Sequence, residues 1–567
     1  MKRLLLGVMG WLACSMAHTS VVVKELSYRG DDDGPALSRT QYRNPVLAGF
    51  YPDPSAIRVG DDFYLVNSSF GYFPGLPVFH SRDLVTWTQV GNAIDRPSQI
   101  DYGRNELTRG LFAASISHHD GTFYITNTCF YCDGGNYVIT AKDPAGPWSN
   151  PVWLGFEGID PSLFFDQDGS AWLVNNGLPE GKLRYQGHRA IWIQQFDVAS
   201  MKLIGPRNVI VDAGADPATH PEHIEGPHLF RNHDYYYLTA AEGGTGEQHA
   251  QMIYRSRQIT GPYEAWAGNP ILTQRDLPTD YTHPVTSAGH AQLIELKDGS
   301  WWAVFLATRP YRGNQYNLGR ETFLLPVTWQ DDWPVVLPHG ERVPLVAKRP
   351  ALPRDPATMP MNGPFHWSEH FHGPTLPMQW MTINAPHSPW YVTGADGLHI
   401  EPSTTPLGDY KSGQPAYLAH RLQHRKARIS ATFDIHRMEP NEQAGLALFQ
   451  NETHFYTAAL TNDGSGRSLV LSMRAGKDAP ATGVVFARLA LPGNTTLVSL
   501  RFELDGPRLD VFYALKADDW HPLGRGLDAS LLSTASAGGF TGVTFGPYAY
   551  KPATGSGVTA AAQQAKD

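Results

Sequence analysis

Charged residues are scarce in this chain of 567 residues, where Asp, Glu, Lys and Arg together make up 17%. The formal net charge is -9, and no extended run of Lys or Arg occurs. A protein that holds nucleic acid or an anionic membrane surface by charge needs a basic patch, which this sequence does not supply. The expected partner is therefore an uncharged molecule.

Cysteine is almost absent, since the chain has three: Cys14, Cys129 and Cys132. A cysteine-based zinc site needs further ligand pairs at suitable spacing, and the sequence has none. Cys129 and Cys132 lie in a strand-like segment and not at the start of a helix, which argues against a redox motif. In an oxidising compartment the two can form a local disulfide or stay as free thiols, and both alternatives remain open.

Long apolar runs are missing beyond the N-terminus, so no later segment offers the ~20 apolar residues of a membrane span. The N-terminus has the pattern of a signal peptide over residues 1–17: a basic start, an apolar stretch at 4–13, and small Ser15 and Ala17 before a cleavage site. A buried helix would leave that pattern unexplained, and the residues before Cys14 make a poor lipobox. We therefore expect export to the periplasm or the medium.

Glycine, proline and aromatic residues are plentiful, with 55 Gly, 44 Pro and 11% aromatic residues. Such a composition suits many short strands joined by tight turns. The length exceeds what one growing hydrophobic core supports, so two large domains are expected. The sequence thus predicts an all-β protein with two domains.

Five segments repeat one plan: a strand-like run, a tight polar turn of the Asp-Gly kind, and an aromatic-rich strand. Such turns between apolar runs are hairpin signals. The segments start about 50 to 65 residues apart, which fits blades of four strands. We therefore expect a five-bladed β-propeller over residues 40–345. The five segments are 53–64, 112–124, 160–172, 225–237 and 290–302.

The starts of the five inner strands should meet at one mouth of the propeller channel. Because a hairpin returns to the face it left, the ends of the second strands should ring the same mouth, and the third strand of the last segment should begin there, at Arg320. The mouth is therefore expected to hold three carboxylates, a histidine and an arginine between aromatic walls. The inner strands start at Asp53, Phe112, Asp160, Glu225 and His290.

Simpler interpretations exist for single residues in this pattern. One acidic residue at a strand start often only caps a turn, and we assign that role to Asp166 and Asp168, which lack the spacing of a calcium loop. His220 and His223 resemble metal ligands, but a polar loop is the preferred interpretation. His290 is either a hydrogen-bonded channel residue or a ligand to calcium or water. Turn capping does not explain why three acidic residues occupy the same position in their repeats.

Three motifs resemble those of the family 43 glycoside hydrolases, the β-xylosidases and α-L-arabinofuranosidases. They are NPVLAGFYPDPS at residues 44–55, GIDPSLFF at 158–165 and EGPHL at 225–229. The resemblance implies that Asp53 is the general base, that Asp160 orients the site and tunes its pKa values, and that Glu225 is the general acid.

The resemblance also implies a set of substrate-binding residues. Phe70 and Arg320 should line the subsite of the cleaved sugar, together with Phe112 and His290. Tyr51 stands where the family often has His or Asn, and we include it among the substrate-binding residues because it lies next to the base in sequence.

The resemblance continues beyond the propeller. Five prolines between 346 and 365 predict a semi-rigid linker. Residues 366–552 resemble the concanavalin-like β-sandwich that accompanies many of these enzymes, and Phe540 is a candidate for an aromatic residue that closes the pocket. The small, polar residues 553–567 predict a disordered tail.

These features predict an exo-acting glycosidase that releases xylose or arabinose from xylan-derived oligosaccharides or arabinosylated polysaccharide with inversion. Inversion needs an acid and a base ~6.5–9.5 Å apart on opposite faces of the sugar. No cofactor is expected to be required, while a structural calcium ion at His290 and the oligomeric state stay open. The alternatives are a non-catalytic sugar-binding propeller and a metal-dependent hydrolase built on His220, His223 and His290.

Overall fold

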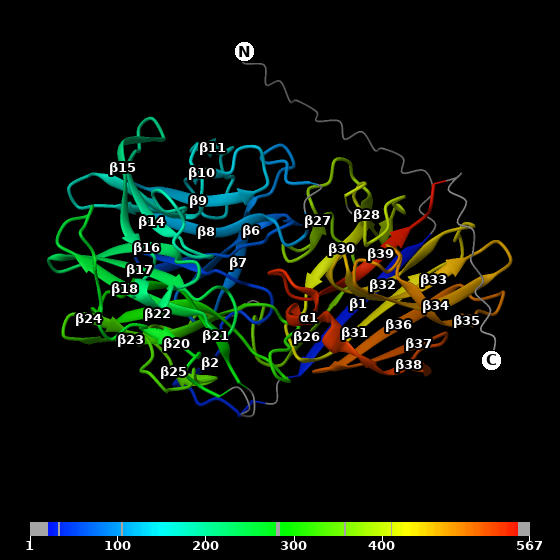
Figure 1. Ribbon diagram of the computed structural model, residues 1–567. Helices are drawn as coiled ribbons and strands as arrows, with labels where there is room; N and C mark the ends of the chain where they lie inside the picture. The colour runs from blue at the N-terminus through cyan, green and yellow to red at the C-terminus, as the bar shows by residue number, and fades with distance from the viewer. Residues whose placement is uncertain are drawn as a thin grey trace, which may run out of the picture.

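The regular secondary structure of the chain is almost entirely β-strand in the computed structural model (Figure 1). Within the described part, helix is limited to α1 (Thr534–Ala537) and the 3-10 turns η1 (Pro217–Thr219) and η2 (Ala529–Leu532), and no helix is long and apolar enough to cross a bilayer. The predicted signal peptide and all of the predicted tail after Ala553 lie outside the described residues. The structure describes residues 21–31, 34–103, 106–278, 284–356, 359–409 and 411–553.

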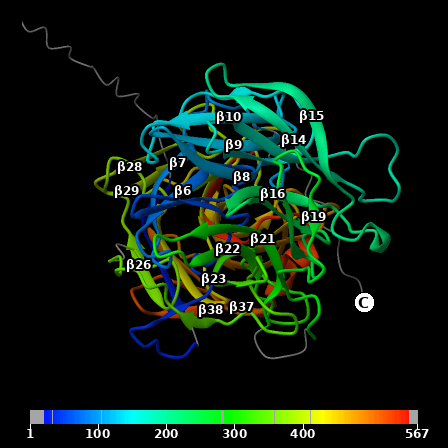
Figure 2. The same cartoon turned by 90° about the vertical axis from the view of Figure 1, so that its left-hand side faces the viewer.

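Five antiparallel sheets form the blades of a β-propeller and are arranged around a common centre (Figure 2). Blade one contains β3 (Ser55–Val59), β4 (Asp62–Val66), β6 (Gly75–Ser81) and β7 (Thr88–Ile94). Blade two contains β8 (Gly110–His119), β9 (Thr122–Phe130), β10 (Asn136–Ala141) and β11 (Val152–Trp153). Blade three contains β12 (Ile159–Phe165), β13 (Ala171–Gly177), β14 (Ala190–Asp197) and β15 (Lys202–Asp212).

The last two blades follow the same order. Blade four contains β16 (Glu225–Asn232), β17 (Tyr235–Glu242), β18 (Ala250–Ser256) and β19 (Glu264–Ala265), and β20 (Leu272–Thr273) also pairs with β18. Blade five contains β21 (Thr286–Glu295), β22 (Trp301–Thr308), β23 (Glu321–Gln330) and β24 (Trp333–Val335). The five-bladed propeller expected from the repeat is confirmed.

The inner two strands of every blade form the hairpin that the repeat predicts. Glycine supplies a left-handed backbone in four of the five turns, and no atom lies within 4 Å of where its Cβ would be. These glycines are therefore required by the conformation of the turn and not by crowding. The four are Gly60, Gly121, Gly169 and Gly299.

The segment predicted as a semi-rigid linker is docked on the propeller. It begins with β25 (Val346–Lys348), which pairs with β2 (Gln41–Arg43) and so joins the chain entering the propeller to the chain leaving it. Farther along, the backbone N–H of Asp355 donates to Asp83 at 3.0 Å, and Met361 is buried. Proline fixes the extended course of this segment, but hydrogen bonds and burial hold it in place.

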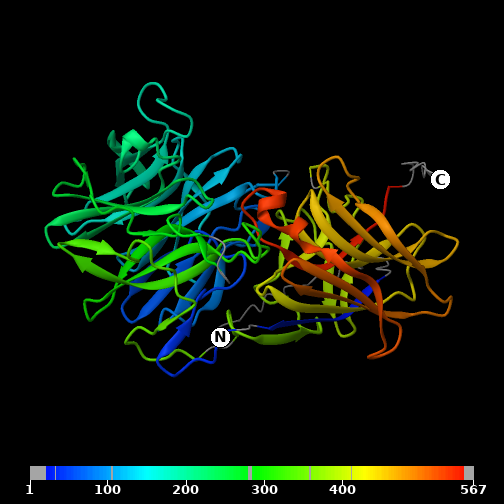
Figure 3. The ribbon, with the colours of Figure 1, turned by 60° about the horizontal axis from the view of Figure 1, so that its bottom comes forward.

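Two sheets form a β-sandwich beside the propeller (Figures 1 and 3). The first sheet has the order β28 (Tyr391–Gly394), β29 (Gly397–Ile400), β1 (Val22–Asp31), β31 (Lys426–Asp434), β36 (Leu497–Asp505), β37 (Arg508–Ala514) and β38 (Trp520–Asp528), with β26 (Phe365–Glu369) also paired to β1. The second has the order β35 (Val484–Ala490), β34 (Arg467–Ala475), β33 (His454–Asn462), β32 (Gln443–Asn451), β39 (Thr544–Tyr550), β30 (Ala416–Arg421), β27 (Met381–Ile383) and β5 (Tyr72–Phe73).

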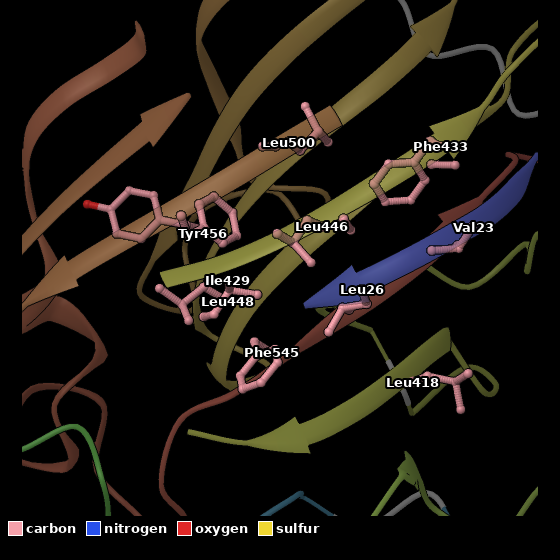
Figure 4. Packing of buried hydrophobic residues seen from close by; sticks show 14 of the residues in the cluster. Val23, Leu26, Leu418, Ile429, Phe433, Leu446, Leu448, Tyr456, Leu500 and Phe545 are labelled. Atoms are coloured by element: carbon pink, nitrogen blue, oxygen red, sulfur yellow. The ribbon is translucent and has the colours of Figure 1, made fainter. Parts of the chain in front are cut away.

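The sandwich takes strands from outside the range 366–552 expected for it. Strand β1 precedes the propeller in sequence, yet it pairs with β26, β29 and β31, and its Val23 and Leu26 are buried in the sandwich core (Figure 4). Strand β5 lies between two strands of blade one and pairs with β27. A fully buried aliphatic side chain contributes about 1.5–3 kcal/mol to folding, so β1 is part of the sandwich and not a leader to the propeller.

Candidate active site

A pocket of about 380 Å³ brings together residues from all five blades and from the sandwich. Each of the five predicted strand starts is present in its lining. Seven of the eight residues proposed as site residues line it, and Tyr51 does not. The lining residues are Asp53, Phe70, Phe112, Ala113, Ile159, Asp160, Glu225, Thr245, His290, Arg320 and Phe540.

The inner strands are kinked where they reach this pocket. Asp53, Asp160 and His290 have left-handed backbones with φ of 51°, 55° and 51°, and Gly226, next to Glu225, has φ of 59°. Register shifts interrupt the hairpins of blades two to five at the same level. A bulge turns a side chain out of the alternation of its strand, and non-glycine residues with positive φ concentrate at functional sites. The kinks therefore aim these side chains into one pocket.

Asp53 is buried and surrounded by donors. Ser68 Oγ donates to Asp53 Oδ2 at 2.5 Å, and Arg320 Nη1 donates to Asp53 Oδ1 at 2.8 Å. His290 Nδ1 lies 3.9 Å from the same oxygen. The bond from Arg320 is charge-assisted, and with that from Ser68 it fixes the orientation of the carboxylate. Ser68 follows β4, in the polar strand end that the repeat placed at the mouth, but sequence reasoning assigned it no role of its own.

The loop that carries Asp53 is held by both domains. The backbone N–H of Gly49 donates to the buried carboxylate of Glu321 at 2.7 Å, and Thr322 Oγ1 donates to the carbonyl oxygen of Tyr51 at 2.7 Å. From the sandwich, Arg421 Nε donates to the carbonyl oxygen of Phe50 at 2.7 Å. Hydrogen bonds therefore fix three successive residues of this irregular loop, 49–51, before it reaches Asp53.

Asp160 and Glu225 are the acidic groups whose surroundings favour the protonated form. Burial raises the pKa of Glu225 to about 7, and the negative charge of Asp53 adds to the rise while Arg320 opposes it. Burial also raises the pKa of Asp160 well above its usual range, as do the charges of Glu225 and Asp53, although the N–H of Gly226 donates to Asp160 Oδ2 at 3.1 Å. The family resemblance assigned the tuning of pKa values to Asp160, but burial is the largest cause of the raised pKa of Glu225.

Neutral histidines pack below the carboxylates. Burial lowers the pKa of His290, that of His228 to about 3 and that of His249 to about 4. A Cβ at Gly226 would lie 2.7 Å from the His290 ring, so glycine is needed there for close approach as well as for its φ. Because these rings stay uncharged, the positive charge that faces Asp53 comes from Arg320.

The sandwich completes the pocket through Phe540. The N–H of Phe540 donates to Thr108 Oγ1 at 2.7 Å, and its ring stacks on Phe70 with centroids 5.8 Å apart. The Arg320 guanidinium lies 5.5 Å from the Phe540 ring centroid and 5.8 Å from that of Phe70. Phe540, the aromatic residue that the sequence offered as a candidate to close the pocket, therefore forms part of its wall.

Tyr51 lies elsewhere than expected. Its side chain is 1% exposed, packs edge-on against Phe79 and lies under the guanidinium of Arg421, 4.6 Å from the ring centroid. The loop before β3 has no strand alternation from which the direction of a side chain could be inferred. Tyr51 therefore supports the loop of Asp53 from below and does not line the pocket.

The other histidines of the metal-like motif are apart from the pocket. The His220 ring stacks on Tyr185 at 4.7 Å, and His223 lies partly exposed beside Glu222, with 3.9 Å between Nδ1 and Oε1. Among the described residues, no group of three or more His, Cys, Asp or Glu side chains has an arrangement that holds a metal ion. The preferred interpretation, a polar loop before blade four, agrees with these positions.

Comparison with known proteins decides the family. The sequence pattern described as "Glycosyl hydrolases family 43" matches residues 42–334, and that described as "Beta xylosidase C-terminal Concanavalin A-like domain" matches residues 368–565. The chain belongs to glycoside hydrolase family 43. It is thus a glycoside hydrolase with an accessory concanavalin-like domain, and the two matched ranges account for most of its length.

Relatives of this family 43 enzyme extend the match over both domains. A xylosidase/arabinosidase of Butyrivibrio fibrisolvens is 37% identical over 89% of this chain and 95% of its own length. A non-reducing end α-L-arabinofuranosidase of Bacteroides ovatus is 36% identical over 91% of this chain and 92% of its own. The crystal structure of a GH43_12 protein retrieved from capybara gut metagenome superposes with a TM-score of 0.87 at 36% identity, covering 94% of this chain and 100% of the other.

Proposed function

We propose that this enzyme is exported and releases single xylose or arabinose units from the ends of xylan-derived oligosaccharides or arabinosylated polysaccharide, with inversion at the anomeric carbon. The observation that carries the proposal is the set of three carboxylates, Asp53, Asp160 and Glu225, in one pocket with Arg320. A non-catalytic sugar-binding propeller would have no need for an acid and a base in contrasting surroundings.

The roles follow from those surroundings. Asp53, with Arg320 and Ser68 donating to it, is the base that takes a proton from the attacking water. Glu225, whose pKa burial raises to about 7, is the acid that protonates the leaving oxygen. Its carboxyl makes no hydrogen bond within the described residues and is available to the substrate. Asp160 accepts a hydrogen bond from the N–H of Gly226, next to Glu225, and so orients this part of the site.

The shape of the pocket supports attack at a chain end. Phe70, Phe112 and Phe540 contact one another and form an apolar wall of the pocket that also holds the carboxylates. Such a wall accommodates one sugar ring and stops the chain there. The name of the Bacteroides ovatus relative refers to the non-reducing end, in keeping with this mode of action.

Two parts of the proposal concern the setting of the enzyme. The basic, apolar and small residues of 1–17 support export to the periplasm or the medium, and mass spectrometry of secreted protein should find a start near His18. The residues that perform the reaction are carboxylates and an arginine, so no cofactor is required, and any calcium ion at His290 would be structural. Full activity is therefore expected after exhaustive chelation, and its loss would favour the metal-dependent alternative.

The decisive experiment combines substrate and stereochemistry. Hydrolysis of nitrophenyl β-D-xyloside and nitrophenyl α-L-arabinofuranoside would show which pentose is preferred. Proton NMR of the first-formed sugar should then show the inverted anomer. A retained anomer would overturn the single-displacement mechanism, and binding of pentosides without any hydrolysis would favour the non-catalytic alternative.

A further inference from the structure

A line of aromatic rings leads from the pocket wall to the surface. Phe112, in the wall, stacks face to face on Phe130 with centroids 4.8 Å apart and an interplanar angle of 2°. Phe130 in turn contacts Tyr131 at 4.5 Å. Tyr131 is 70% exposed, so the line ends on a ring that faces solvent two ring contacts away from the pocket wall.

The structure holds this exposed ring in place. Cys129 and Cys132 form a disulfide whose loop contains Phe130 and Tyr131, and Tyr131 has a left-handed φ of 65°. The guanidinium of Arg109 lies 5.2 Å from the Phe130 ring centroid and 5.7 Å from that of Tyr131. A bulky residue with positive φ is uncommon, and exposure of its ring yields little burial in return. Burial of apolar surface in the free protein therefore does not explain why a tyrosine occupies this exposed position.

The place of the ring points to the ligand. Phe540, held by its hydrogen bond to Thr108, contacts Phe112 within the aromatic wall, whereas Tyr131 follows the end of β9 and lies beyond Phe112 and Phe130. A sugar bonded to the one in the pocket has to leave it on an open side. The C–H faces of a pentose bury apolar surface against an aromatic ring, and Arg109 carries donors suited to sugar hydroxyls.

We propose that Tyr131, held by the disulfide and by Arg109, is the platform on which the leaving-group sugar of the substrate stacks. The site takes a neutral pentose unit of an oligosaccharide, and it sets the preference for oligosaccharides over small glycosides. This inference rests on the proposed glycosidase function, because it assigns the position of the sugar beyond the cleaved bond.

The test compares a substrate that reaches Tyr131 with one that does not. Xylotriose, or arabinotriose if the enzyme prefers arabinofuranosides, carries leaving-group sugars, whereas the corresponding pentosyl fluoride carries a single atom. Tyr131→Ala should lower kcat/KM for the trisaccharide about tenfold, equivalent to about 1.4 kcal/mol of binding free energy. It should leave kcat/KM for the fluoride and inhibition by the free pentose within about twofold.

Two variants serve as controls. Tyr131→Phe keeps the ring and should keep trisaccharide activity, while Phe486→Ala removes an aromatic ring that is 46% exposed on the sandwich and should change neither substrate. Equal losses on both substrates, or no loss on either, would overturn the platform while hydrolysis by the unaltered enzyme still supports the proposed function. If the unaltered enzyme hydrolyses neither substrate, the proposed function itself is wrong.

Discussion

Asp53 and Glu225 share one pocket but have different neighbours. Asp53 accepts hydrogen bonds from Arg320 and Ser68, and Glu225 accepts none from the described residues. Burial therefore acts on Glu225 without a compensating donor and raises its pKa to about 7. Two carboxyl groups of similar intrinsic acidity thus have contrasting surroundings, as the proposed roles of base and acid require.

Substitution of the two groups should separate these tasks. Glu225→Gln should lower kcat by about 10²–10⁴-fold for substrates with poor leaving groups, such as xylobiose, and far less for nitrophenyl glycosides, which need little protonation. Asp53→Asn should abolish hydrolysis of both kinds, because no leaving group compensates for an unactivated water. Equal losses for Glu225→Gln across a series of leaving groups would contradict its role as the acid.

The pH profile should report the proton on Glu225. An acid whose pKa is raised keeps its proton until the pH passes that value, so kcat should fall as the pH rises through about 7. Burial and the charge of Glu225 raise the pKa of Asp160 well above its usual range, so Asp160 carries no charge at the pH where Glu225 loses its proton. Asp160→Asn is also uncharged at this position and should leave the fall of kcat near pH 7. A fall displaced to lower pH in Asp160→Asn, measured with a nitrophenyl substrate, would show instead that an ionised Asp160 repels Glu225.

At the scale of single elements, glycines with similar backbone angles serve two purposes. Gly60, in the turn after β3, has φ of 67° and open space around its Cβ position. Gly226, at the kink of β16, has φ of 59° and lies against the His290 ring. The first glycine permits a turn, and the second also lets a strand approach the residues of the neighbouring blade.

This difference predicts contrasting effects of one substitution. Gly60→Ala should cost only the strain of a left-handed alanine, about 1–2 kcal/mol, and leave kcat unchanged. Gly226→Ala should cost more and also lower kcat on every substrate, because His290 has to move and the N–H that binds Asp160 moves with the backbone. Thermal unfolding and kcat of both variants test the prediction. Similar kcat values for the two would show that the kink is not needed for catalysis.

The propeller hairpins could be predicted because their signals are local. A turn such as that at Gly169 and the apolar alternation beside it lie within a few residues of each other. Asp160 and Glu225 were identified because they occupy the same position relative to such a turn in their repeats. The kinks could not be predicted, because a register shift changes the direction of side chains but not their type. Tyr51 was placed wrongly for a related reason, since its loop has no period from which its direction follows.

Strand β1 escaped prediction for a different reason. The alternation of its residues, in which Leu26 and Tyr28 are buried and Ser27 is partly exposed, is typical of a strand. Its partners, however, begin more than 300 residues later, at β26 and β31, and no local signal identifies such pairing. The predicted division of the chain into a propeller followed by a sandwich therefore left β1 unassigned.

At the scale of the whole molecule, the two domains depend on each other. Loss of packing in the sandwich should disturb the pocket, because Arg421, which holds the loop of Asp53, and Phe540, which lines the pocket, come from that domain. Leu26→Ala, in the buried part of β1, should destabilise the sandwich by about 2–5 kcal/mol and reduce activity at temperatures where the propeller alone would survive.

Calorimetry and activity measured against temperature would test this dependence. Leu37→Ala, at a side chain that is 41% exposed in the same N-terminal part of the chain, is the matched control and should change little. If Leu26→Ala unfolds the sandwich and leaves activity intact, the two domains act independently and the support from Arg421 and Phe540 is dispensable.

The position of β1 between strands that lie after the propeller also sets an order of assembly. The strands of each blade pair with near neighbours in sequence, so the blades can form one after another as the polypeptide is synthesised. Strand β1 is synthesised before any of them, and it has to stay unpaired until its first partner, β26, arrives more than 300 residues later. Its apolar side chains are exposed during that interval, when a chaperone that binds extended apolar segments would protect the nascent enzyme from aggregation.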